Sequence, residues 1–105
     1  MIKASFFYPN KDGARFDHQY FQENHIGKLV NDRWSPMGLK QFGVEKGLAG
    51  GAPGAPAPYV ASAYVVFDSV EAFQKAFAAH GEEIVADIKN YTDLEPIVQV
   101  SEIVT

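Results

Sequence analysis

The stretch from Tyr59 to Phe67, Tyr-Val-Ala-Ser-Ala-Tyr-Val-Val-Phe, constrains the fold more than any other part of the chain. Its β-branched and aromatic residues predict a β-strand. Apolar or small residues occupy both alternating faces of this strand, whereas a half-exposed strand would carry polar residues on one face. We therefore expect the strand to lie at the centre of a sheet, with another layer of structure covering each of its faces.

Other segments carry the periodicity of helices and strands, and turn residues separate them. Asp17 is suited to cap a helix, and Gly81 is expected to break one. We expect, in order, a strand at 2–8, a helix from 17 to 29 that continues irregularly towards 34, a strand at 38–48, a proline-rich loop at 50–58, the central strand, a helix from 70 to 80, a further helical piece at 82–89, a polar loop at 90–93 and a closing strand at 96–104.

The predicted order β-α-β-β-α-β is that of a ferredoxin-like α+β fold, a four-stranded antiparallel sheet with two helices on one face. The helices leave the other face of the sheet uncovered. Because the central strand is apolar on that face too, an isolated monomer would expose a large hydrophobic patch. We therefore expect a homodimer in which two sheets pack face to face.

Composition limits the partners and the chemistry. The 105 residues fit one domain spanning 1–105, and 9 basic against 13 acidic residues give a net charge of -4, which argues against nucleic acid or an anionic membrane as partner. The chain has no cysteine, and hence no disulfide, thiolate nucleophile or cysteine metal site. No apolar run has the length of a signal peptide or membrane span. These features favour a cytoplasmic protein.

His25 is the candidate catalytic residue, because it lies within an apolar stripe of the first helix. Phe21, His25 and Leu29 follow at intervals of four and should face the core. A histidine there is either a hydrogen-bonded structural group or an acid/base that faces a cavity. From the topology, Asp87 or Asn90 in the late part of the chain could approach it as an orienting partner.

Aromatic residues near the strand ends provide candidate ligand contacts. Tyr8, Tyr20, Phe21 and Tyr64 are expected to line a pocket for a small hydrophobic or aromatic molecule, with Tyr8 and Tyr64 orienting a carbonyl group. The alternative is that such residues only pack the core and a dimer interface. Asp87 and Asn90 complete the predicted substrate-binding set.

Five segments of the chain are characteristic when their order and spacing are taken together. They are the strand ending in Tyr8, Phe16-Asp17-x-x-Tyr20-Phe21-x-x-x-His25-Ile26, Pro58-Tyr59, Val66-Phe67-Asp68-Ser69-Val70-Glu71-Ala72-Phe73 and Ala86-Asp87-Ile88-x-Asn90-Tyr91-Thr92-Asp93. In these segments the chain resembles the EthD family of the dimeric α+β barrel superfamily, and the resemblance extends over nearly its whole length. Where the family's helix motif has a proline, this chain has Gly27.

The resemblance implies a dimeric barrel and a link to the degradation of ethyl tert-butyl ether, in which the family's member accompanies a haem-thiolate monooxygenase system. Superfamily relatives include cofactor-free monooxygenases, polyketide cyclases and muconolactone-type isomerases. The resemblance therefore leaves open whether this chain is an enzyme with oxidoreductase, cyclase or isomerase chemistry, or a non-catalytic ligand-binding or accessory protein.

No metal or organic cofactor is expected from the motifs. The three histidines, His18, His25 and His80, include no pair at the i, i+4 spacing of a helical zinc site, and no phosphate or dinucleotide loop is present. Haem bound through His25 is a further alternative, because some relatives in the superfamily bind haem.

Overall fold

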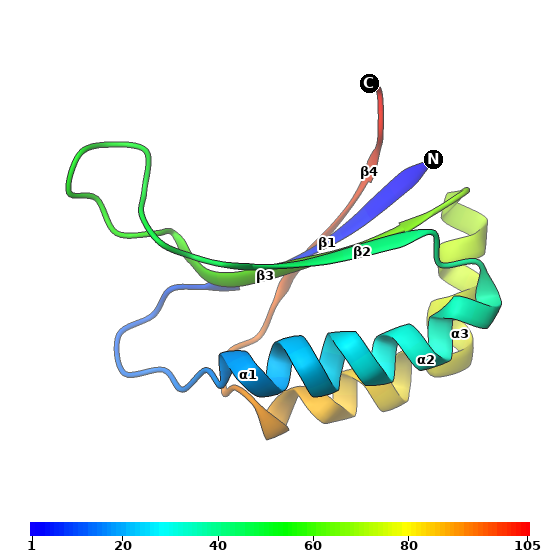
Figure 1. Ribbon diagram of the computed structural model, residues 1–105, viewed down its shortest axis with the longest axis horizontal. Coiled ribbons are helices and arrows are strands. Elements are labelled where there is room, and N and C mark those ends of the chain that lie inside the picture. Colours follow the sequence, from blue (N-terminus) through cyan, green and yellow to red (C-terminus); the bar gives the residue numbers. More distant parts are fainter.

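The computed structural model describes residues 1–105 and places the helices on one face of a four-stranded antiparallel sheet of order β2-β3-β1-β4 (Figure 1). This is the ferredoxin-like α+β fold that the sequence predicts. Its elements are β1 (Ile2–Pro9), α1 (His18–Tyr20), η1 (Phe21–Val30), α2 (Asn31–Trp34), η2 (Ser35–Met37), β2 (Gln41–Lys46), β3 (Tyr59–Phe67), α3 (Val70–Asp87), η3 (Ile88–Asn90) and β4 (Ile97–Glu102).

The central strand β3 has the bounds that its sequence predicts, and it is paired on both sides, by β1 and β2. Strands β2 and β4 are shorter than predicted. The apolar residues of 38–48 and 96–104 extend beyond the hydrogen-bonded ladders, and the ladder partners, not the local pattern, determine where an edge strand ends.

The first helical region is continuous from α1 to η2 and has π-type hydrogen bonding through η1. Asp17 caps it as predicted, since its Oδ1 accepts a bond of 3.1 Å from the Tyr20 amide. The predicted stripe is confirmed for Phe21 and His25, whereas Leu29 packs against the core only half-buried and Val30 is fully buried. The wider π turn, in which hydrogen bonds join residues five apart, brings Val30 to the buried position that follows His25.

The second helix does not break at Gly81. Helix α3 runs through it, and Gly81 is buried beneath the ring of Phe77, where an added Cβ would lie 2.6 Å from ring carbons. The glycine therefore allows a close side-chain contact instead of ending the helix. His80 consequently lies within the helix and not at its C-terminal end.

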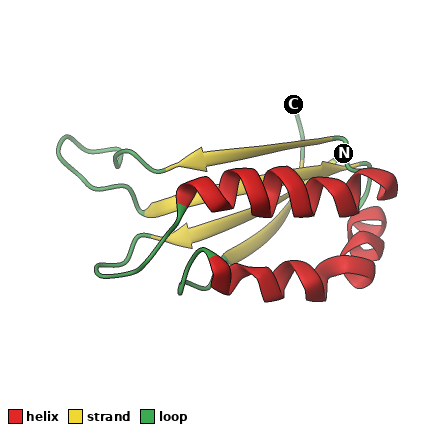
Figure 2. Ribbon diagram, turned by 60° about the horizontal axis from the view of Figure 1, so that its bottom comes forward, coloured by secondary structure: helices red, strands yellow, loops and turns green.

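The two helical segments cover a single face of the sheet (Figure 2). Alternate residues of β3, among them Ala63 and Val65, are buried against the helices. The opposite face presents Lys3, Ser5 and Tyr64 together with apolar side chains, so it is a mixed surface and less apolar than the sequence of β3 alone predicts. Neither helical segment combines the length and apolar character needed to cross a bilayer.

Candidate functional site

A set of long-range hydrogen bonds holds the chain before the first helix against the chain after α3. The Asp17 amide donates to the Tyr91 carbonyl at 2.8 Å, and the Thr92 hydroxyl donates to the Arg15 carbonyl at 2.6 Å. The Arg15 guanidinium donates to the Lys89 carbonyl at 2.8 Å. These bonds fix the end of α3 beside the first helix, although some 75 residues separate the two segments along the chain.

Asp87, the last residue of α3, accepts hydrogen bonds from three of the residues that the sequence singles out. The His25 Nδ1–Asp87 Oδ2 distance is 2.8 Å. The Tyr20 hydroxyl and the Asn90 amide both donate to the other carboxylate oxygen, Oδ1, each at 2.8 Å. Asp87 is thus the direct partner of His25, whereas Asn90 contacts the carboxylate and not the imidazole.

Burial and this contact determine the charge state of the pair. Burial lowers the pKa of His25 below its ordinary value of 6.5, and the contact with Asp87 opposes that shift. Burial raises the pKa of Asp87, but the bonds from His25, Asn90 and Tyr20 outweigh it and leave this pKa lowered. At neutral pH an ionised carboxylate therefore accepts the Nδ1 proton of a neutral imidazole, and Nε2 carries a free lone pair.

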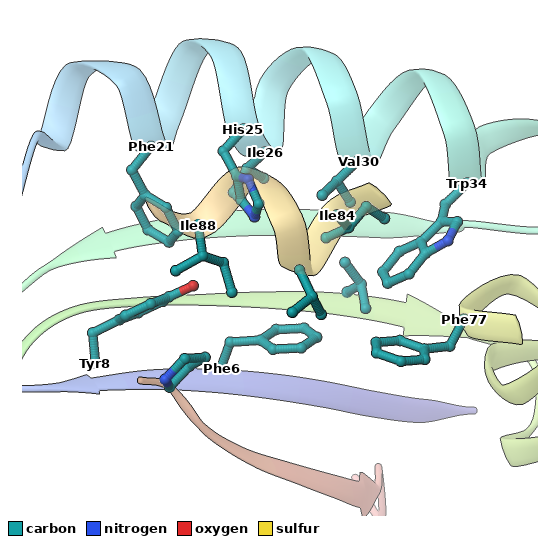
Figure 3. A pocket seen from close by; sticks show the side chains of 13 residues that line it. Phe6, Tyr8, Phe21, His25, Ile26, Val30, Trp34, Phe77, Ile84 and Ile88 are labelled. Carbon is teal, nitrogen blue, oxygen red and sulfur yellow. The ribbon is translucent and has the colours of Figure 1, made fainter. Parts of the chain in front are cut away.

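His25 Nε2 faces a small apolar cavity between the sheet, η1 and α3 (Figure 3). Nε2 makes no hydrogen bond within the chain. Every fully buried side-chain nitrogen or oxygen does have a hydrogen-bond partner, so Nε2 is not fully buried and borders open space. The cavity has a volume of about 50 Å³. It is lined by Phe6, Tyr8, Phe21, His25, Ile26, Val30, Trp34, Val65, Phe77, Ile84, Val85, Ile88 and Pro96.

The cavity is closed around its polar groups and open at an apolar rim. His25 and Tyr8 are only 3% and 2% exposed, whereas Phe77 and Val85 at the rim are 39% and 52% exposed. The indole nitrogen of Trp34 is already bonded to the Ala76 carbonyl at 3.0 Å. The His25 imidazole and the Tyr8 hydroxyl are therefore the polar side-chain groups that remain for a ligand.

Tyr91 is a site residue that the predicted set does not include. Its hydroxyl lies 2.5 Å from that of Tyr8, and its ring centroid lies 4.7 Å from that of His25 and 5.1 Å from that of Phe21. The sequence offered one signal, because Tyr91 is the aromatic residue in the otherwise polar loop 90–93 and follows Asp87 by four positions.

The structure does not bring Tyr64 to this site. Ala63 and Val65 face the helices, so Tyr64 between them points to the opposite face of the sheet. Its hydroxyl accepts a bond of 3.2 Å from the Gln41 amide, and the Lys3 ammonium lies 5.0 Å from its ring centroid. Of the other predicted contacts, Tyr8 and Phe21 line the cavity, while Tyr20, Asp87 and Asn90 lie behind His25.

The cavity is too small to hold a haem group whose iron is bound by His25. Its volume of about 50 Å³ is far below the several hundred cubic ångströms, about 300 or more, of pockets that hold large ligands. No cluster of three or more His, Cys, Asp or Glu side chains has an arrangement suited to a metal ion.

Comparisons with known proteins agree on a family. The model of the EthD domain family matches residues 11–95. An EthD-like protein from Ralstonia eutropha JMP134 is 45% identical, with a TM-score of 0.92 over 99% of this chain and 92% of that chain. A search of curated proteins finds no significant match.

More distant structures share the fold. An ethyl tert-butyl ether (EthD) family protein from Bacillus halodurans C-125 is 18% identical, with a TM-score of 0.57 over 98% of each chain. A dimeric ferredoxin-like protein from an uncultured marine organism is 15% identical, with a TM-score of 0.64 over 100% of this chain and 96% of that chain.

Proposed function

Because the chain belongs to the EthD family, we propose that it binds a small hydrophobic compound in the cavity and transforms it with His25 as acid/base. The reaction belongs to the degradation of ethyl tert-butyl ether or of a related small compound. Its chemistry is that of a cofactor-free oxidoreductase, a cyclase or an isomerase, each of which requires a proton to be moved at carbon or oxygen.

The observation that carries this proposal is the orientation of His25. Its Nδ1 is bonded to Asp87 at 2.8 Å while Nε2 faces an apolar cavity. A carboxylate that accepts the Nδ1 proton fixes the tautomer and stabilises the imidazolium that forms when Nε2 takes a proton. A purely structural histidine would have both ring nitrogens bonded within the core.

The second candidate is a non-catalytic protein that carries or protects a ligand for a haem-thiolate monooxygenase system. The lining of the cavity supports it, because 11 of the 13 lining residues are hydrophobic and few groups are available for chemistry. This candidate and the enzyme differ in what His25 does to a bound ligand, and not in whether the ligand binds.

The pH dependence of proton abstraction tests the acid/base role. Cyclopentanone in D₂O is a suitable probe, because it is a small apolar ketone and its α-protons exchange when a base removes them. Protein-catalysed exchange, followed by NMR from about pH 5 to 8, should be constant at high pH and fall as Nε2 is protonated. Because burial lowers the pKa of His25, the midpoint should lie below 6.5. A midpoint at or above that value, or no catalysed exchange, would contradict the proposal.

We expect a homodimer formed through the uncovered face of the sheet. Phe7, Tyr64 and Val66 lie on this face among polar residues, and apolar and polar groups together are typical of a protein interface. Native mass spectrometry should give twice the chain mass of 11.6 kDa. Tyr64→Glu, which puts a charge on this face at a half-buried position of the central strand, should shift the protein towards monomer, and an unaltered dimer would place the interface elsewhere.

A further inference from the structure

The two phenols beside the cavity form a hydrogen-bonded pair with unequal surroundings. Their hydroxyl oxygens are 2.5 Å apart. Tyr91 is 0% exposed, does not line the cavity and has no other hydrogen-bond partner for its hydroxyl. Tyr8 borders the cavity, and Figure 3 shows its oxygen directed towards the open space beneath His25.

This difference determines which hydroxyl donates. If Tyr8 donated to Tyr91, the Tyr91 proton would be buried without any acceptor, which is unfavourable for a hydroxyl group. If Tyr91 donates to Tyr8, every buried proton is bonded and the Tyr8 proton can turn into the cavity. The second arrangement also polarises the Tyr8 hydroxyl and makes it a stronger donor.

We propose that Tyr91 orients Tyr8 so that the Tyr8 hydroxyl donates to the carbonyl oxygen of a bound ligand, within reach of His25 Nε2. The inference rests on the proposed function and specifies its substrate class, small ketones and related compounds with a proton on the carbon next to the carbonyl. Tyr8 contacts the substrate, and Tyr91 is a positioning residue that acts through Tyr8.

The proton balance of the step follows from these positions. His25 Nε2 takes a proton from the carbon next to the carbonyl, and the electron pair of the broken C–H bond forms the C=C bond of an enolate. The enolate oxygen accepts the Tyr8 hydrogen bond, which strengthens as negative charge develops there. The imidazolium then returns the proton to the same or another carbon, so no oxidant or reductant is needed.

The phenols are suited to donate and not to act as bases. Burial raises the pKa of Tyr8 to about 12, although the bond from Tyr91 opposes the shift, and burial raises the pKa of Tyr91 further still. Both hydroxyls are therefore protonated at neutral pH. The rings of Phe16 and Phe21, with centroids 5.5 and 5.1 Å from that of Tyr91, hold the donor in place.

Cyclopentanone and methylenecyclopentane test the inference, because they have nearly the same shape but only the ketone accepts a hydrogen bond. Trp34 lines the cavity, so its fluorescence reports the binding of both. In Tyr8→Phe the affinity for the ketone relative to the alkene should fall about fivefold, the effect of one neutral hydrogen bond. The infrared C=O stretch of bound ketone should lie at lower wavenumber in the wild type than in Tyr8→Phe, and Tyr91→Phe should give an intermediate value.

The control is Tyr59→Phe, which removes the hydroxyl of a half-exposed tyrosine outside the cavity and should change neither quantity. Equal relative affinities and equal C=O frequencies in the wild type and Tyr8→Phe, or no binding of the ketone, would overturn the inference. Unchanged values in Tyr91→Phe alone would overturn the role of Tyr91. Failure of the proposed function appears differently, as a shifted C=O stretch without His25-dependent deuterium exchange.

Discussion

Replacing His25 with alanine should lower the rate of cyclopentanone deuterium exchange by roughly 10²- to 10⁴-fold, the usual contribution of a positioned general base. The substitution removes the only basic group that lines the cavity, because the other polar side chains there, the Tyr8 phenol and the Trp34 indole, do not take up a proton at neutral pH. Ligand affinity measured by Trp34 fluorescence should change little, because the apolar lining remains. This combination of lost exchange and retained binding is the result expected of an enzyme.

His25→Gln separates loss of the base from damage to the fold. A glutamine can still donate a hydrogen bond towards Asp87 but cannot take a proton at neutral pH, so its exchange rate should be as low as that of His25→Ala. His80→Ala, on α3 outside the cavity, is the matched control and should exchange like the wild type. If the His25 variants keep the wild-type rate, the accessory function is favoured over catalysis.

The sequence predicted the sheet more completely than the helices. The apolar residues on both faces of β3 predicted its central place in the sheet, and the periodicities of the other segments predicted the β-α-β-β-α-β order. The helical errors arose where contacts overrode local rules. Gly81 was expected to end α3 and instead lies under the Phe77 ring, and in the π-type region Val30 is buried more fully than Leu29.

From the sequence, only those contacts of the candidate site that follow from the topology could be predicted. The expected approach of Asp87 to His25 required only that the end of α3 lie beside the first helix. The positions of Tyr64 and Tyr91 depended on the side-chain direction in a strand and on long-range hydrogen bonds, respectively. A residue that is next in the sequence to one lining the cavity can point to the opposite face of the sheet, as Tyr64 does. The place of Tyr91 depends on the bonds from Asp17 and Thr92 to distant backbone, which no local pattern encodes.

Replacing Asp87 with asparagine should lower the same exchange rate by roughly 10- to 10³-fold, less than a full loss of the base. An orienting carboxylate holds the imidazole in one tautomer, and its amide analogue can instead donate to Nδ1 and leave the proton on Nε2. The Tyr20 and Asn90 donors would still find the remaining amide oxygen. The variant should therefore fold, which circular dichroism and thermal unfolding would verify.

The pH profile distinguishes a positioning role of Asp87 from a merely structural one. The Asp87 charge raises the pKa of His25 against the effect of burial, so its removal should move the midpoint of the exchange profile to lower pH. Asp68→Asn removes an exposed carboxylate that lies 3.5 Å from the Lys40 ammonium, and it should leave both rate and midpoint unchanged. A reduced rate in Asp87→Asn with an unshifted midpoint would mean that Asp87 only supports the fold. Loss of packing would lower the rate without shifting the pKa of His25.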